Sequence, residues 1–229
     1  MQPGAPSTDK GQKSRRELMA IAIDCFARFG FQGSSVDRIA RMAGVTKGAI
    51  YYHFRDKEDL LAAAVADRIA EFESRVQRSC DGADPLAALR RIAEVCVKHA
   101  ESNDHPRFII TLMVEAIETN ETISVQLRDM MRRFRAFLRR LIKEGQEREF
   151  IRADRDPKAV AAGYTSWILG AEVQYYQDPE HFDFRSALAV YLDQLAGDLA
   201  ADGTRVGLGE SVEIGEAADA PILREIEDS

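Results

Sequence analysis

Histidine and cysteine supply most metal ligands and many catalytic nucleophiles, and this chain has four histidines and three cysteines. Cys96 and His99 stand three residues apart, which on a helix puts both on one face. A metal sensor built on this pair would need at least a third ligand, and no His or Cys stands at the spacing to supply one. The sequence also lacks GxSxG, HExxH, GxGxxG and phosphate-loop motifs. We therefore expect no catalytic residues, metal or cofactor, and a protein that is not an enzyme.

A different chemistry, contact with nucleic acid, is indicated by the stretch KGAIYYH at residues 47–53. Lys47 can neutralise a phosphate, and the small residues after it allow close approach to base edges. Tyr51 and Tyr52 carry hydrogen-bonding tips on flat rings, which suits sugar and phosphate. The alternative is that both rings only pack against neighbouring helices, as aromatic residues at helical spacing often do. The candidate set in this stretch is Lys47, Gly48, Ala49, Tyr51, Tyr52 and His53.

Two short helices are predicted to position this set. Residues 36–43 have apolar side chains at helical spacing, Ser34 or Ser35 can cap the N-terminus, and Gly44 suits the C-terminus. Thr46 can cap a second helix over residues 47–54, on which Ile50 and Phe54 face inward. Two helices joined by a tight glycine turn are typical of a helix-turn-helix.

The stretch from Arg15 to Leu61 resembles the tetracycline-repressor (TetR) family of bacterial transcription regulators. The resemblance is carried by Ala22, Phe26, Gly30, Phe31, Ser35, Val36, Ile39, Ala40, Ala43, Gly44, Val45, Lys47, Gly48, Ile50, Tyr51, His53, Phe54, Lys57, Glu58 and Leu60. It covers about a quarter of the chain without an insertion. It implies that Ser35, Thr46 and Lys57 join the set above as DNA-binding residues, Lys57 by contacting a phosphate. It also implies a ligand in the C-terminal domain that moves the fourth helix.

The charge distribution agrees with this interpretation. The net charge is −7, but residues 1–57 carry +5 and residues 58–229 carry −12. A basic domain joined to an acidic one is expected of a DNA-binding domain attached to a domain with another task. No apolar run approaches the ~18 residues of a membrane span. The N-terminus does not resemble a secretory signal, and the odd, widely spaced cysteines suggest a reducing compartment, so we expect a cytoplasmic protein.

The pattern predicts an all-α fold of about nine helices, with a helix-turn-helix domain before a ligand-binding and dimerisation domain. We expect a disordered basic arm at residues 1–12, the DNA-binding domain at 13–56, the helical domain at 57–201, and a mostly disordered acidic tail at 202–229. The first helix is predicted over residues 14–29, capped by Ser14, with Phe29 on its buried face and Gly30 at its end.

The last two predicted helices, at residues 157–176 and 184–199, are apolar or small on more than one face. Such helices need a second burial surface, and in the resembled family the corresponding helices form the dimer interface. Gly170 has a second interpretation as a simple helix irregularity. The predicted homodimer interface comprises Gly163, Gly170, Leu188, Tyr191, Leu192 and Leu195.

The candidate effector-binding residues are the larger or polar side chains of the central helices. Glu115 and Glu172 lie within apolar runs and can orient a polar or cationic group, unless each faces solvent or an arginine. We expect an apolar or aromatic effector. The predicted set, besides Glu172, is Cys96, His99, Phe108, Met113, Glu115, Phe134, Phe137, Tyr164, Trp167 and Tyr175.

Taken together, the sequence predicts a homodimeric, ligand-responsive repressor that places residues 47–54 in the major groove of a palindromic double-stranded DNA site. Two other classes remain open. An architectural protein would bind DNA without a preferred site. A helical small-molecule-binding protein would carry its helix-turn-helix incidentally.

Overall fold

The computed structural model describes residues 8–102 and 107–201, with the side chains of residues 14–102, 107–115 and 120–201. Within these ranges the fold is all-α, apart from one isolated bridge between Ile151 and Ala200. The predicted class and the predicted number of helices are confirmed. The helices are α1 (Thr8–Gly33), α2 (Val36–Ala43), α3 (Lys47–His53), α4 (Lys57–Cys80), α5 (Pro85–Ala100), α6 (Arg107–Thr119), α7 (Glu121–Glu147), α8 (Pro157–Gln177) and α9 (Phe184–Leu199).

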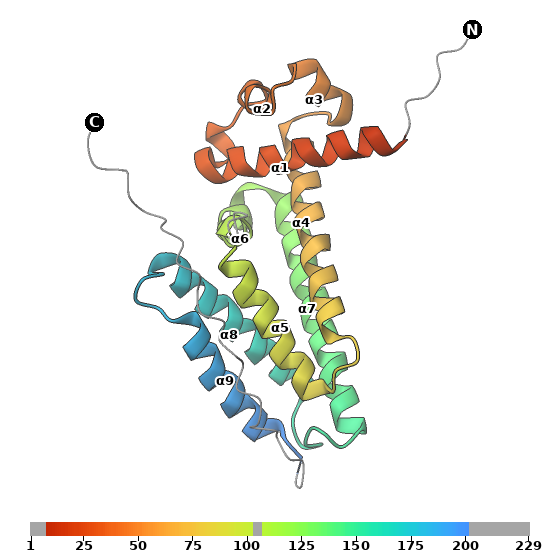
Figure 1. Ribbon diagram of the computed structural model, residues 1–229, viewed down its shortest axis with the longest axis vertical. Helices are drawn as coiled ribbons and strands as arrows, with labels where there is room; N and C mark the ends of the chain where they lie inside the picture. The colour runs from red at the N-terminus through yellow and green to blue at the C-terminus, as the bar shows by residue number, and fades with distance from the viewer. Residues whose placement is uncertain (1–7, 103–106, 202–229) are drawn as a thin grey trace.

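We call α1–α3 the head and α4–α9 the body. Figure 1 shows the head lying across the N-terminal end of α4, with the other body helices below it and α9 on the outer side of α8. Helices α4 and α7 run the length of the body, so they link the end that carries the head to the opposite end. None of the described helices is long and apolar enough to cross a membrane.

The helix-turn-helix has the predicted caps. The hydroxyl of Ser35 accepts a hydrogen bond from the Arg38 amide at 3.2 Å, and that of Thr46 accepts one from the Ala49 amide at 3.3 Å. Gly44 ends α2 with φ 64°, a left-handed conformation that favours glycine. Ser34, the alternative cap, is buried instead and donates to the Gly30 carbonyl at 2.7 Å. Local capping rules therefore place α3 correctly.

Helix α1 differs from the prediction at both ends. It begins at Thr8, so the prediction of a disordered arm is wrong for residues 8–12, because extending a formed helix costs far less than nucleating one. At its other end the chain kinks at Gly30 (φ 68°) and continues to Gly33. Phe29 is 46% exposed rather than buried, and the Arg38 guanidinium lies 4.3 Å from its ring centre. The arm at residues 1–7 and the tail at 202–229 lie outside the described residues.

The buried side chains form two hydrophobic clusters. The first, which we call the head cluster, joins the head and the start of α4 to Phe108 and Leu112 of α6 and to Leu127 and its neighbours on α7. The second, the body cluster, joins the later parts of α4 and α7 to α5, α8 and α9 and includes Leu138. The head therefore shares its core with part of the body.

Candidate nucleic-acid interface and effector cavity

Helix α3 presents its aromatic side chains to solvent. Tyr52 is 75% exposed and Tyr51 is 48% exposed, so the alternative in which both rings only pack against neighbouring helices is wrong. The Tyr52 and His53 rings pack edge to face on the outward surface of α3, with 4.9 Å between their centroids. Gly48 is also exposed, and Ala49 is half-buried. The inward side of the helix is anchored by Ile50, which is buried.

Lys47 stands at the first position of α3 and is exposed. Its Nζ lies 3.0 Å from a carboxylate oxygen of Asp37 on α2. The hydrogen bond that Lys47 donates to Asp37, followed by the charge of that carboxylate, raises the pKa of Lys47. With this exposed ion pair formed, the ammonium lies 6.0 Å from the Tyr51 ring centre. A phosphate group can replace Asp37 as its partner at little cost, because exposed pairs are weak.

Lys57 contacts the main chain beside Ser35, another predicted DNA-binding residue. Its Nζ donates to the carbonyl of Phe31 at 2.8 Å and to that of Ser34 at 3.1 Å, and it lies 4.0 Å from the Phe31 ring centre. In this conformation the ammonium stabilises the turn between α1 and α2 rather than pointing to a ligand. Arg55, two residues after the end of α3, has a side chain that is 85% exposed and lies 3.4 Å from the Asp59 carboxylate.

A cavity of about 70 Å³ lies between the two hydrophobic clusters. We call it the seam cavity, because residues of the head cluster and of the body cluster both line it. Helices α1 and α4–α8 all contribute to its wall. Among the predicted effector-binding residues, the cavity is lined by Cys96, His99, Phe108, Met113, Phe134 and Glu172.

The remaining predicted effector residues do not line this cavity. Tyr164 is buried in the body cluster and donates to the Leu89 carbonyl at 2.7 Å. Trp167 stacks on Tyr191 at the outer surface of α8 and α9. Phe137 is half-buried on α7 and packs at the edge of the body cluster. The helical periodicity of these residues predicts that their side chains face a neighbouring helix, but it does not predict which helix.

Glu172 is the one carboxylate among the residues lining the seam cavity. Its side chain is 7% exposed and makes no hydrogen bond with the described residues. Burial raises its pKa to about 8. The two alternatives for this residue, a place in solvent or against an arginine, are therefore wrong. Within the described ranges, no three His, Cys, Asp or Glu side chains converge as a metal site would require.

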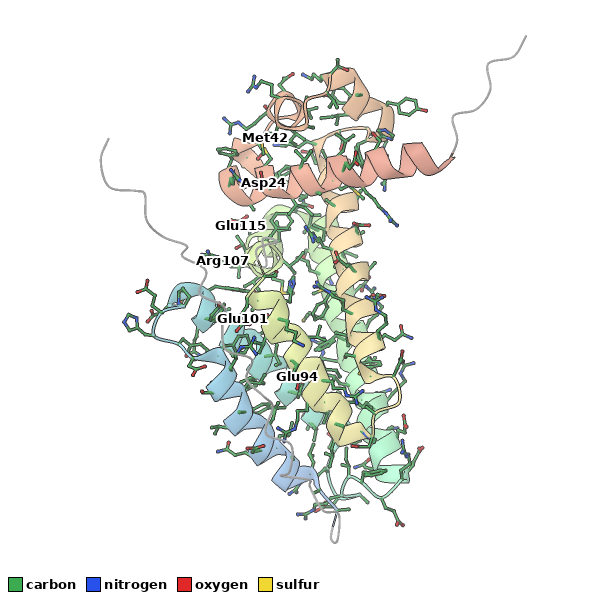
Figure 2. The ribbon with its side chains drawn as sticks, viewed as in Figure 1. Asp24, Met42, Glu94, Glu101, Arg107 and Glu115 are labelled. Carbon is green, nitrogen blue, oxygen red and sulfur yellow. The ribbon has the colours of Figure 1, made fainter. Side chains whose placement is uncertain are left out.

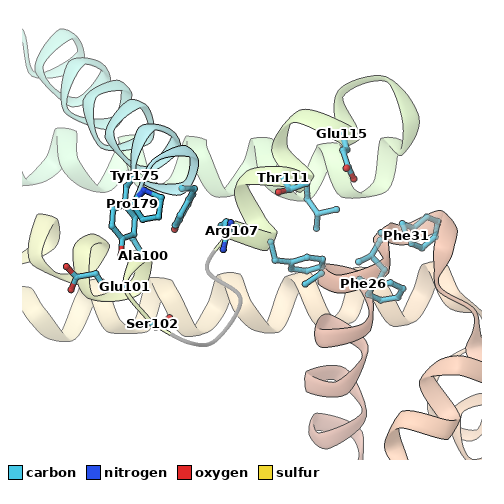
Figure 3. Close-up of a pocket in the computed structure, with 16 residues that line it drawn as sticks. Phe26, Phe31, Ala100, Glu101, Ser102, Arg107, Thr111, Glu115, Tyr175 and Pro179 are labelled. Carbon is cyan, nitrogen blue, oxygen red and sulfur yellow. The ribbon is translucent and has the colours of Figure 1, made fainter. Parts of the chain in front are cut away.

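A larger, open groove of about 800 Å³ lies between the head and the body. Figure 3 shows it between Phe26 and Phe31 of α1, Arg107 and Thr111 of α6, and Tyr175 near the end of α8. The predicted effector residues Glu115 and Tyr175 line this groove and not the seam cavity. Figure 2 places Glu115 and Arg107 just below the head. Phe108 lines both spaces, so it separates the groove from the cavity.

Helices α8 and α9 present a second apolar surface, which we call the outer face. Gly163 and Gly170 are exposed on it, and Val190 is 58% exposed. The stacked rings of Trp167 and Tyr191, 4.3 Å apart, form its centre. The residues Tyr191 and Leu195 are half-buried, and Leu188 and Leu192 are buried in the chain's own body cluster. Of the predicted interface residues, Leu188 and Leu192 therefore occupy the inner side of α9 and pack within the chain's own core.

An exposed recognition helix on a capped helix-turn-helix, above a helical body with an internal cavity, defines a DNA-binding transcriptional regulator. The comparisons agree with this class. Residues 18–64 match the family model "Bacterial regulatory proteins, tetR family", and residues 85–200 match the model "BetI-type transcriptional repressor, C-terminal". The second match alone covers half of the chain, and the protein belongs to the tetR family.

Its similarity to characterised members is moderate. The transcriptional regulator AcrR of Shigella flexneri is 26% identical over 189 residues, which cover 80% of this chain and 87% of that protein. A TetR regulator from Chloroflexus aurantiacus has the same fold, with a TM-score of 0.78, 22% identity, and coverage of 85% of this chain and 100% of that one. The complex of SmeT, a Stenotrophomonas maltophilia efflux-pump repressor, with triclosan has a TM-score of 0.70 at 22% identity and covers 84% and 94% of the two chains.

Proposed function

We propose that the protein is a cytoplasmic, homodimeric repressor that binds a pseudo-palindromic operator and is released from it by a mainly apolar effector. The observation that carries this proposal is the position of the seam cavity. Its wall includes Ile23 of α1 and Ile69 and Phe72 of α4, the helices that form and support the head. A molecule in the cavity therefore touches the elements on which the position of α3 depends.

The volume of the cavity supports a mechanism of release. Pockets for drug-sized ligands measure roughly 300–1,000 Å³, whereas the seam cavity holds about 70 Å³. A ligand of ordinary size must therefore push its walls apart. Close-packed helices move as units rather than deforming continuously, so this expansion shifts α4 and α1 and favours a state that fits the operator poorly. The groove beside Phe108 offers a route for a ligand to reach the cavity.

On the DNA side, we assign phosphate and sugar contacts to Lys47, Tyr51 and Tyr52, with Gly48 and Ala49 nearest the base edges. Ser35 and Thr46 act through their caps, which fix the two helices. The support is the exposure of the α3 side chains and the weak, replaceable pairing of Lys47 with Asp37. Two α3 helices related by a two-fold axis require a pseudo-palindromic operator.

The DNA upstream of the gene for this protein is the first target to test. A labelled duplex from that region and a scrambled duplex of equal length are titrated across a salt series. We expect tight binding to one palindromic segment and weak binding to the scrambled DNA. Equal, steeply salt-dependent binding to both duplexes would favour an architectural protein, because only the electrostatic component would remain.

The dimer is assigned to the outer face, because its exposed apolar side chains are continuous across α8 and α9. Val190→Asp should convert the dimer to a monomer in analytical ultracentrifugation and weaken operator binding. Val114→Asp on α6 is the matched control, since Val114 is 70% exposed and lies on another helix. A dimer that survives the Val190 substitution but not the Val114 substitution would move the interface away from α8 and α9.

A further inference from the structure

The seam cavity contains a feature that an apolar effector alone does not explain. Glu172 is more than nine-tenths buried, lines the cavity and has no hydrogen-bond partner among the described residues. Burying a carboxyl group without a partner costs several kcal/mol, so such a group usually serves a ligand. Thr165, the other buried polar residue of the wall, donates to the Ala161 carbonyl at 2.8 Å and needs no ligand.

The charged groups near Glu172 indicate which ligand charge would fit the cavity. The wall contributed by α1, α6 and α7 is apolar. The titratable or charged groups near it are Arg68 and Arg75 on α4, Cys96 and His99 on α5, and Tyr176 one turn along α8. None of these groups forms an ion pair with Glu172.

Each arginine near the cavity has a contact of its own, although Nε of Arg75 is buried without a hydrogen-bond partner. The Nη1 atom of Arg68 lies 3.5 Å from the Glu71 carboxylate, and Nη2 of Arg75 lies 3.3 Å from Nδ1 of His99. The Cys96 thiol is also buried, and burial raises its pKa well above the usual value, so it adds no negative charge. Glu172 is the one carboxylate lining the cavity, and the partner that we infer for it is a donor with positive charge.

Aromatic rings line the same cavity as this acidic group. The rings of Phe72 and His99 are 5.8 Å apart, those of Phe72 and Phe134 are 6.2 Å apart, and all three residues line the cavity. The faces of phenylalanine rings attract cations as well as hydrocarbon. A cavity lined by a carboxylate and such rings suits a small cationic head on an apolar body.

We propose that the effector is a protonated primary or secondary amine with an apolar body, whose ammonium group donates to Glu172. This proposal rests on the proposed function, since it names the chemical class that the seam cavity recognises. Burial raises the pKa of Glu172 to about 8, so the carboxyl group is mostly protonated at neutral pH before a ligand binds. When an ammonium ion enters, the carboxyl group ionises and its proton leaves to solvent, while the new ion pair satisfies both charges.

The test uses the full-length dimer and four probes with one alkyl chain: hexylamine, 1-hexanol, hexanoate and hexyltrimethylammonium. Calorimetry at pH 6.5 in two buffers of different ionisation enthalpy measures affinity and proton release together. We expect hexylamine to bind at least tenfold more tightly than each of the other three and to release close to one proton. At pH 9 the released proton should disappear, since Glu172 is then ionised before binding.

Glu172→Gln keeps the shape of the side chain and removes its charge, so it should lower hexylamine affinity at least tenfold and abolish proton release. Glu172→Met serves as a second variant with the same expected result. Glu180→Gln is the matched control, because Glu180 is exposed beyond the end of α8, and it should bind hexylamine as the parent protein does. Circular dichroism verifies that each variant is folded.

Several results would overturn the amine assignment: no binding of hexylamine, equal or tighter binding of any other probe, or unchanged hexylamine binding by Glu172→Gln. Release of an established operator by the same probes separates this failure from failure of the proposed function. Release of the DNA by hexanol as well as by hexylamine would support a ligand-responsive repressor and exclude amines as its specific effector class. If hexylamine binds through Glu172 but leaves the DNA bound, the amine class stands and the proposed control of DNA binding falls.

Discussion

The head cluster and the body cluster differ in how they relate to the order of the chain. The head cluster begins in α1 but also contains Phe108 on α6 and Leu127 on α7, far along the sequence. The body cluster lies entirely between Val76 and Leu199. This difference shows that the head does not pack as an independent unit. A shift of α6 or α7 changes the core on which the head rests.

The two clusters also differ in their buried polar groups. Ser34, beside the head cluster, donates to main-chain carbonyls and so stabilises the end of α1. Glu172, beside the body cluster, has no hydrogen-bond partner among the described residues. A satisfied polar group favours one fixed structure, whereas an unsatisfied one favours a change when a ligand supplies the partner.

Substitution of two leucines on α7, one in each cluster, should give the largest effects and tests whether the two clusters are distinct. Leu127→Ala and Leu138→Ala remove equal side chains from α7, one in each cluster, and each should lower the free energy of unfolding by about 2–5 kcal/mol. Hydrogen exchange should rise in the head amides of the Leu127 variant more than in those of the Leu138 variant. Equal protection of the head in both would show that the clusters do not divide the molecule as described.

A smaller effect is expected from the pH dependence of stability. Because burial raises the pKa of Glu172 to about 8, its protonated form stabilises the fold below the unfolded value of 4.5, and this contribution is lost as pH rises through 8. Between pH 6 and pH 9 the parent should lose about 2 kcal/mol more than Glu172→Gln. Urea unfolding at both pH values measures the difference, and parallel pH profiles would show that Glu172 is not buried as a neutral acid.

Substitution of the exposed ring on α3 should affect DNA binding and not folding. Tyr52→Ala should weaken operator binding about tenfold, which is ~1.4 kcal/mol, while unfolding changes by less than about 0.5 kcal/mol. Fluorescence anisotropy and thermal unfolding measure the two effects. Tyr52→Phe keeps the ring, so its affinity shows how much the hydroxyl contributes. Parent-like affinity in the alanine variant would remove Tyr52 from the interface.

The smallest expected effect concerns Lys47 and its partner. Lys47→Ala should lower the slope of log affinity against log salt by about 1, because one phosphate contact is lost. Asp37→Asn frees the ammonium and should raise affinity a few-fold at low salt. Titrations at four salt concentrations measure both variants. An unchanged slope for Lys47→Ala would mean that Lys47 meets no phosphate.

Much of the head was predictable from the sequence because its signals are local. Ser35, Gly44 and Thr46 act on residues within five positions of themselves, so their roles follow from residue type and spacing alone. The exposure of Tyr51 and Tyr52 also follows from the inward position of Ile50. Lys57 was harder to predict, because its partners are carbonyls more than twenty residues away.

The sequence by itself therefore determined the helices, the helix-turn-helix and the surface that α3 presents. The tertiary structure alone decided that Trp167 stacks on the outer face, that Tyr164 is tied to Leu89, and that Glu172 lines a cavity without a partner. The physical reason is that helical periodicity records which side of a helix is buried. It carries no information about which of several neighbouring helices buries that side, or whether the packing leaves a space there.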